Sequence, residues 1–158
     1  MAEKLLTTRR DLDDAFIHLL SLARKRIRIF DGSLASFPLT QKLAMDGLQA
    51  FLDQDPEARL SIALQDPEPC RSHHPRLMTL LRQRSHAFAL LQVPEALAGL
   101  QDAMLLVDDR HALVRFHRDQ SRGKLIEDDA LACRPYNKRY EDILESGCSP
   151  ISGTSLGL

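Results

Sequence analysis

The stretch QDAMLLVDDRHALVRFHRD, residues 101–119, decides the fold. Its segment AMLLV, residues 103–107, is apolar throughout, which is typical of a strand buried on both faces. A short polar break follows, and residues 112–117 then alternate, so that Arg115 and His117 share one face while Val114 and Phe116 share the other. Two short runs separated by a few polar residues predict an antiparallel hairpin.

The end of this second strand carries a cluster of polar side chains. Arg115 and His117 share a face there, and Arg118 follows directly. A guanidinium group offers a planar fork of donors and an imidazole can donate or accept a proton, so the pair is a candidate anion clamp. The alternative is that the strand simply emerges into solvent, since charged side chains are mostly exposed.

Helical and strand patterns alternate before this stretch. Thr8 followed by Asp11 resembles a capping box, and the basic residues 24–26 complement the dipole at the end of that helix. Thr40 is predicted to cap the second helix, and Leu43 belongs to its predicted apolar face. The predicted helices cover residues 8–25, 41–54 and 75–84, and the predicted strands cover residues 27–30, 60–64 and 87–93.

The alternation predicts a single α/β domain of three layers, with a mixed sheet and helices on both faces. Strands joined by helices run parallel, because the crossover needs that length, and the hairpin adds antiparallel pairing. A short strand over residues 124–126 and a helix from Pro135 to Glu145 complete the predicted domain, residues 1–145. The small, polar and Gly-rich residues 146–158 predict a flexible tail.

Two carboxylates follow two of the predicted parallel strands. Asp31 comes directly after the first strand, and Asp66 stands in the same place after the second. Ligands of open α/β sheets lie outside the carboxyl ends of the strands, so both residues are site candidates. The alternative is that they accept hydrogen bonds from the amides of their own loops.

The segment 67–75 is predicted to be an irregular loop that contains Cys70, His73 and His74. A thiol and two imidazoles are ligands that zinc accepts, but their spacing matches no closed structural site and no second cysteine pair stands nearby. We therefore predict no metal site.

Composition narrows the class of protein. The chain has 158 residues and a formal net charge of −1, which fits one domain and argues against binding dominated by bulk charge. It has no apolar run of about 18 residues, and its first residues lack the apolar core of a signal peptide. The widely spaced Cys70, Cys133 and Cys148 are typical of free thiols. We expect a cytoplasmic protein without a cofactor or a membrane partner.

The central stretch resembles the signature region of the phospholipase D superfamily. That signature runs His-x-Lys, four residues, Asp, then six residues and Gly-Ser-x-Asn. Aligned on Asp108, the chain has Gln101 in place of the His and Ala103 in place of the Lys. The Gly, Ser and Asn positions hold Arg115, Phe116 and Arg118.

This resemblance implies a phospholipase D-like half-domain over residues 9–128. The family's His attacks phosphorus and its Lys and Asn bind phosphate, so Gln101 and Ala103 imply a degenerate member without that chemistry. Active members need two signature copies, which implies a homodimer here. The ending Arg-Phe-His-x-Asp is also similar to that of an uncharacterised group of short bacterial proteins, sometimes joined to acetyltransferase domains.

Three functions stay open from the sequence, in this order. The first is a non-catalytic module that binds a phosphate-containing ligand or a protein partner, with nucleic acid as a less favoured ligand. The second is an accessory subunit of another enzyme. The third is a divergent phosphodiesterase or nuclease that uses His117. The predicted ligand-binding residues are Arg115, His117, Arg118, Asp31, Asp66 and Asp108.

Overall fold

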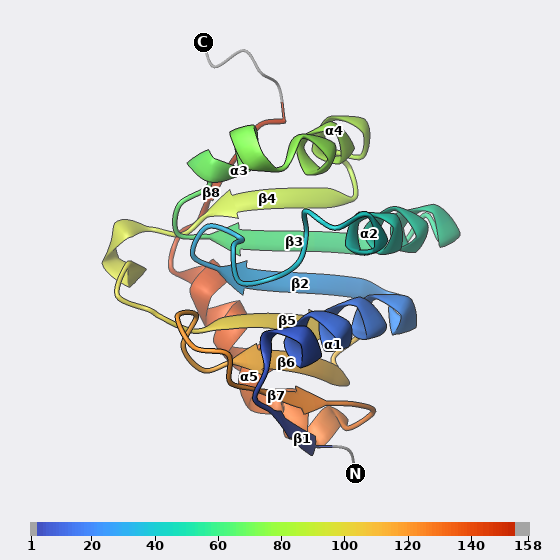
Figure 1. The fold of residues 1–158 in the computed structure, drawn as a ribbon. Helices are drawn as coiled ribbons and strands as arrows, with labels where there is room; N and C mark the ends of the chain where they lie inside the picture. The colour runs from blue at the N-terminus through green and yellow to red at the C-terminus, as the bar shows by residue number, and fades with distance from the viewer. Residues whose placement is uncertain (1–2, 154–158) are drawn as a thin grey trace.

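The computed structural model describes residues 3–153 and contains an eight-stranded sheet with helices on both faces (Figure 1). The strand order is β1-β7-β6-β5-β2-β3-β4-β8. The strands are β1 Glu3–Leu6, β2 Arg26–Asp31, β3 Arg59–Leu64, β4 Phe88–Gln92, β5 Ala103–Val107, β6 His111–Arg115, β7 Gly123–Ile126 and β8 Ser149–Pro150. The helices are α1 Arg9–Leu22, α2 Lys42–Gln54, α3 Glu68–His73, α4 Pro75–Gln83 and α5 Ala130–Glu145, with a 3₁₀ turn over Glu95–Leu97.

Strands β2, β3 and β4 pair in parallel, and every other pairing is antiparallel. The predicted hairpin is formed by β5 and β6, in which Ala103 pairs with Arg115 and Val107 pairs with His111. The prediction of a single mixed α/β domain is confirmed.

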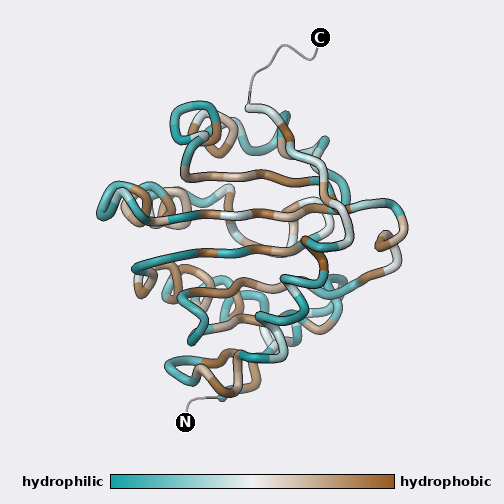
Figure 2. The backbone as a smooth tube through the Cα atoms, turned by 180° about the vertical axis from the view of Figure 1, so that it is seen from behind, coloured by the Kyte–Doolittle hydropathy of each residue, from teal (hydrophilic) through white to brown (hydrophobic). Residues whose placement is uncertain are grey.

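Each face of the sheet has its own apolar layer. Helices α1, α2 and α4 cover one face, and α5 covers the other (Figure 1). Side chains alternate along β2, so that Ile27 and Ile29 pack under α1 and α2 while Phe30 packs on the α5 side. Seen from behind, the hydrophobic residues concentrate in the central strands (Figure 2).

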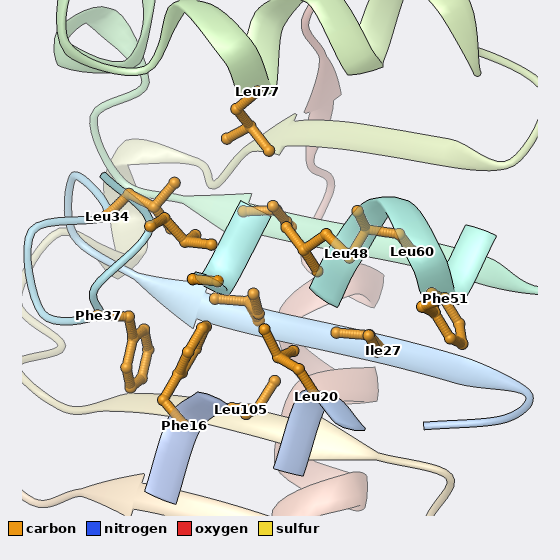
Figure 3. Close-up of a cluster of buried hydrophobic side chains, with 14 of the residues drawn as sticks. Phe16, Leu20, Ile27, Leu34, Phe37, Leu48, Phe51, Leu60, Leu77 and Leu105 are labelled. Atoms are coloured by element: carbon orange, nitrogen blue, oxygen red, sulfur yellow. The ribbon is translucent and has the colours of Figure 1, made fainter. Parts of the chain in front are cut away.

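The loop after β2 belongs to the core and not to the surface. Leu34 and Phe37 are buried among the side chains of α1, α2 and β2, and the Phe37 ring stacks on Phe16 with the ring centroids 4.8 Å apart (Figure 3). Leu34 adopts a φ of 78°, a conformation that costs a branched residue energy and is stabilised here by its complete burial. This packed loop fixes the backbone that lies above the end of β2.

Several boundaries differ from the predictions. The last helix begins at Ala130, capped by the Asp129 side chain, and Pro135 lies inside it. Residues 68–73 form α3, so the predicted irregular loop is wrong. Leu43 is 66% exposed, because the buried face of α2 runs through Ala44, Met45, Leu48, Phe51 and Leu52.

The two ends of the chain also differ from the predictions. Strand β1 was not predicted and pairs with β7. Where a flexible tail was predicted from residue 146, β8 pairs with β4 and the Ile151 amide donates to the Leu90 carbonyl at 2.8 Å. Residues 154–158 lie outside the described part of the chain, and the prediction for them stays a prediction.

His111 gives the fold a pH dependence. The side chain is buried, its Nδ1 accepts a hydrogen bond from the Asp128 amide at 2.9 Å, and burial lowers its pKa from 6.5. At pH values near and below 6.5 the unfolded chain therefore binds this proton more readily than the folded protein does. The free energy of unfolding should decrease as the pH falls below 6.5, with a slope of at most about 1.4 kcal/mol per pH unit for one proton.

Urea unfolding at several pH values checks this. His111→Gln should weaken the dependence, whereas His86→Gln, at an exposed histidine, should leave it unchanged. An unchanged pH dependence in His111→Gln would contradict the assignment.

Candidate anion-binding site

The candidate site lies at the carboxyl edge of the sheet, which we define as the edge where β2, β3 and β4 end, β5 begins and β6 ends. The pairing of Phe30 with Met104 and of Ala103 with Arg115 brings these ends together. Parallel strands that end at one edge leave their loops there, which is where open α/β sheets bind ligands.

Asp31 is buried under the loop that follows β2. Its carboxylate accepts hydrogen bonds from the Gly32 amide at 2.7 Å, the Ser36 amide at 3.0 Å and the Ser36 hydroxyl at 2.8 Å. Burial raises the pKa of Asp31, and these hydrogen bonds oppose that effect. Asp31 therefore binds the amides of its own loop, which is the alternative role that the sequence suggested for it. Its carboxylate is buried beneath that loop.

Arg115 is also buried, although it lies at the end of β6. Its Nε donates to the Gln120 carbonyl and its Nη1 to the Ser36 carbonyl, both at 2.9 Å. Burial lowers the pKa of Arg115, and the nearby charge of Arg9 adds to this effect, yet a guanidinium stays charged at neutral pH. Arg115 thus joins the loop after β2 to the loop after β6.

Arg118 presents a half-exposed guanidinium at this edge. Its amide donates to the Gln101 carbonyl at 2.9 Å, and its Nη1 donates to the Leu100 carbonyl at 3.1 Å. The guanidinium lies against Gly32, where a Cβ atom would come within 2.9 Å of Cζ. Glycine at this position therefore gives the guanidinium its place directly above the end of β2, while the side chain stays half-exposed.

His117 does not form the predicted clamp with Arg115. Its Nδ1 accepts a hydrogen bond from the Asp119 amide at 3.2 Å, whereas Arg115 binds carbonyl groups. With Nδ1 engaged as an acceptor, the proton of the neutral ring is on Nε2, and neither nitrogen offers a free lone pair. This arrangement disfavours His117 as a nucleophile.

The remaining two candidates, Asp66 and Asp108, lie at opposite edges of the sheet. Asp66 lies at the carboxyl edge, where its amide donates to the Gly32 carbonyl at 2.8 Å and its Oδ1 accepts from the Glu68 amide at 3.2 Å. Asp108 lies at the opposite edge, in the turn between β5 and β6, where its carboxylate binds the amides of residues 24–26. Asp108 is therefore not a member of this site.

The His and Lys positions of the signature are occupied by Gln101 and Ala103, which cannot attack phosphorus or pair with phosphate as a cation. Gln101 is exposed just before β5, and Ala103 is completely buried within it. The residue that sequence reasoning missed is Arg9, from the first turn of α1, whose charge affects Arg115. Its position before a helical pattern carries no signal of this long-range proximity.

The zinc-type residues Cys70, His73 and His74 lie on α3 and at its junction with α4. Within residues 3–153, no group of three or more His, Cys, Asp or Glu side chains is placed to hold a metal ion. Cys70 is buried, and burial raises the pKa of its thiol to about 11, so it stays protonated at neutral pH. None of the helices over this part of the chain is long and apolar enough to cross a membrane.

The fold is that of the phospholipase D-like proteins. Nuc, a phospholipase D family member from Salmonella typhimurium, superposes with a TM-score of 0.66 over 96% of this chain and 98% of its own, at 12% identity. Phosphatidylserine synthase from Haemophilus influenzae gives 0.68 over 99% of this chain and 41% of its own, at 13% identity. An archaeal chromatin protein, TrmBL2, gives 0.70 over 96% of this chain and 54% of its own, at 10% identity.

Within that fold, the chain belongs to a family described as a domain of unknown function, DUF7931, which it matches over residues 8–151. None of the curated proteins matches the chain in sequence. The chain spans about half of the archaeal protein and nearly all of Nuc. The structural neighbours thus confirm the fold-level resemblance, and its functional implications remain proposals.

Proposed function

We propose that the chain is a non-catalytic phospholipase D-like module that binds a phosphate-containing anion at its carboxyl edge through Arg118. The observation that carries this proposal is the position of the Arg118 guanidinium. The guanidinium is bound to the Leu100 carbonyl and lies against Gly32, while the Arg118 backbone amide donates to the carbonyl of Gln101, the residue that stands where the signature has its His.

The chemistry of this position supports binding and not turnover. A guanidinium recognises phosphate with a planar fork of donors but cannot attack phosphorus. The Arg118 side chain is half-exposed, whereas Arg115 is buried and its donors are bound to carbonyl groups. Among the neighbours, TrmBL2 is described as a DNA-binding protein, which agrees with recognition of phosphate on this fold.

The test is the melting temperature of the purified protein with inorganic phosphate and with a short DNA oligonucleotide. A ligand at about one hundred times its dissociation constant adds roughly 2.7 kcal/mol. For a domain of this size that corresponds to a rise of roughly 5–10 °C. Arg118→Gln should abolish the rise, because it removes the charge and the donor fork and leaves a shorter, neutral polar side chain.

Arg122→Gln is the matched control, since it removes one charge from an exposed arginine of the same loop. Its melting temperature should still rise with the anion. Equal shifts in the two variants, or none in the wild-type protein, would refute the site and favour a protein partner. A shift with DNA must also weaken with salt, because phosphate contacts release counterions.

The homodimer implied by the family resemblance stays a proposal, and sedimentation at several protein concentrations measures it. The enzymatic alternative requires phosphodiester hydrolysis that is lost in His117→Ala. The hydrogen bond from the Asp119 amide to His117 Nδ1 makes that outcome the less expected one.

A further inference from the structure

A cavity of about 310 Å³ lies between the C-terminal part of α5 and the segment that joins β4 to β5. Its apolar wall contains Leu97, Leu100 and Pro135. Leu97 and Leu100 pack on the apolar layer beneath α5 but stay half-buried, and Pro135 is exposed, so a ligand can reach this wall from solvent. The volume is at the lower end of the range of small-molecule sites.

Leu100 belongs both to this cavity and to the Arg118 site. Its side chain lines the cavity, and its carbonyl accepts the hydrogen bond from Arg118 Nη1 at 3.1 Å. The half-exposed guanidinium and the apolar wall are therefore separated by a single residue, a span that a small organic molecule bridges.

Gln65, directly after β3, fixes the position of this wall. Its Nε2 donates to the Leu97 carbonyl at 2.8 Å and to the Leu100 carbonyl at 2.9 Å. The Leu100 carbonyl thus accepts from Gln65 and from Arg118, so one group sets the spacing between the cation and the wall. A ligand that contacts both finds them already in place, which favours binding because little ordering is needed.

The charged side chains at the rim of the cavity are paired with each other or with a neighbour. Arg139 donates through Nε and Nη2 to the Asp102 carboxylate at 2.9 and 2.7 Å, and Lys138 Nζ lies 2.7 Å from Asp142 Oδ1. Each pair is neutral as a whole, so the rim favours an uncharged group inside the cavity. The guanidinium of Arg118, by contrast, forms no ion pair with a carboxylate of residues 3–153 and keeps its charge for an anion.

We infer that the anion at Arg118 is the phosphate of a small organic phosphate whose compact apolar group enters this cavity. The inference rests on the proposed function, since it takes Arg118 as the phosphate-binding residue. Leu97, Leu100 and Pro135 contact the apolar group and remove it from water. The volume limits that group to about one aromatic ring or a short chain.

Isothermal titration with phenyl phosphate tests the inference, with inorganic phosphate and phenol as controls that carry one of the two groups. Phenyl phosphate should bind at least about tenfold more tightly than either control, since roughly 60 Å² of apolar surface removed from water corresponds to about a tenfold change in affinity. Equal affinities for phenyl phosphate and inorganic phosphate, both lost in Arg118→Gln, would overturn this inference and leave the proposed function standing. Absence of binding by both phosphates would refute the two together.

A variant that fills the cavity separates the apolar contact from the phosphate contact. Ser146 is an exposed residue of the lining, and Ser146→Phe places a ring in the cavity. Its affinity for phenyl phosphate should fall about tenfold, to that for inorganic phosphate, while the affinity for inorganic phosphate stays unchanged. Leu97→Ser, which removes part of the wall, serves if Ser146→Phe does not fold.

The matched control is Leu131→Phe, which adds a ring at a position that is 70% exposed near the other end of α5 and outside the cavity. It should bind both phosphates as the wild-type protein does. Arg118→Gln should lose both. Unchanged affinity for phenyl phosphate in Ser146→Phe, or in Arg118→Gln, would refute the inference.

Discussion

Replacing Asp109 with glycine is expected to lower the free energy of unfolding by about 3 kcal/mol, since it leaves a buried charge without its counter-ion. That charge is Arg28, which is 5% exposed on the α5 face of the sheet. Its Nη2 donates to Asp109 Oδ1 at 2.8 Å and to Asn137 Oδ1 at 2.7 Å, while its Nε has no partner in the described residues. Burial lowers the pKa of Arg28, and Asp109 opposes this effect.

The expected loss of stability in Asp109→Gly depends on how exposed the Asp109 side chain is. Breaking a fully buried pair costs about 3–5 kcal/mol, but the Asp109 side chain is 48% exposed, so water replaces part of what is lost. Glycine is the suitable replacement because Asp109 has a φ of 61°, and alanine would add backbone strain. Urea unfolding measures the change, and the melting temperature should fall by roughly 6–12 °C for a domain of this size.

A double-mutant cycle with Arg28→Met is the control. Methionine fills similar space without a charge, so Asp109→Gly in that background should cost less than half as much. The same cost in both backgrounds would show that Asp109 acts through the turn or through its ion pair with Arg26, and would contradict the account based on Arg28.

The parts of the fold that the sequence predicts are those with a local signal. The apolar run of β5, the alternation of β6 and the capping of α1 by Thr8, whose hydroxyl accepts from the Asp11 amide at 3.1 Å, all depend on neighbouring residues. Pro75 begins α4 as predicted, because its fixed φ and missing N–H suit the first helical turn.

The parts that were missed depend on distant partners. β1 has four residues, three of them exposed, and it exists because β7 offers a free edge. The predicted start of α5 at Pro135 is wrong, because the helix is capped earlier by Asp129. Pro135 has no N–H to donate to the carbonyl of Leu131, but Leu131 is an exposed residue. Likewise, nothing near Gly32 in the sequence reveals that it receives the Arg118 guanidinium.

The candidate site shows the same division. Strand ends predicted Asp31, Asp66 and Arg115 at one edge, and the structure places them there. The sequence does not predict that the Arg115 guanidinium donates to two backbone carbonyls while Arg118 stays half-exposed. This difference depends on how two loops pack on each other.

Replacing Asp108 with glycine is expected to lower the free energy of unfolding by about 3–4 kcal/mol, because hydrogen bonds to a charged acceptor contribute about 1.5–3 kcal/mol each and part of the loss is recovered by water. The Asp108 carboxylate accepts from the amides of Arg24 at 2.8 Å, Lys25 at 2.7 Å and Arg26 at 2.9 Å. These amides belong to the segment that leaves α1 and enters β2.

The sequence predicts that the first helix continues to about residue 25, but α1 ends at Leu22. The contact with Asp108 explains this difference. Amides bound by a carboxylate more than eighty residues away cannot continue a helix. The basic residues 24–26 therefore surround Asp108 and do not form the last helical turn. Hydrogen exchange at the Lys25 and Arg26 amides should accelerate in Asp108→Gly along with the loss of stability.

The matched control is Asp128→Gly. Asp128 also has a positive φ, 55° against 53° for Asp108, but among residues 3–153 its exposed carboxylate pairs only with exposed Arg110. Its loss should change the free energy of unfolding by less than about 1 kcal/mol. Asp108→Asn keeps one acceptor oxygen and should lie between the two glycine variants. Equal losses in Asp108→Gly and Asp128→Gly would contradict a special role for Asp108.

Asp108 is the one signature residue that this chain shares with the phospholipase D superfamily. In the structure its carboxylate has a structural role, because it binds the backbone amides of residues 24–26. It holds the start of β2 at the edge opposite to Arg118, so Asp108→Gly should leave phosphate affinity unchanged at temperatures where the variant is folded. Loss of that affinity in the folded variant would instead make Asp108 part of the ligand site. Unchanged affinity with lowered stability would show that the shared carboxylate serves the scaffold.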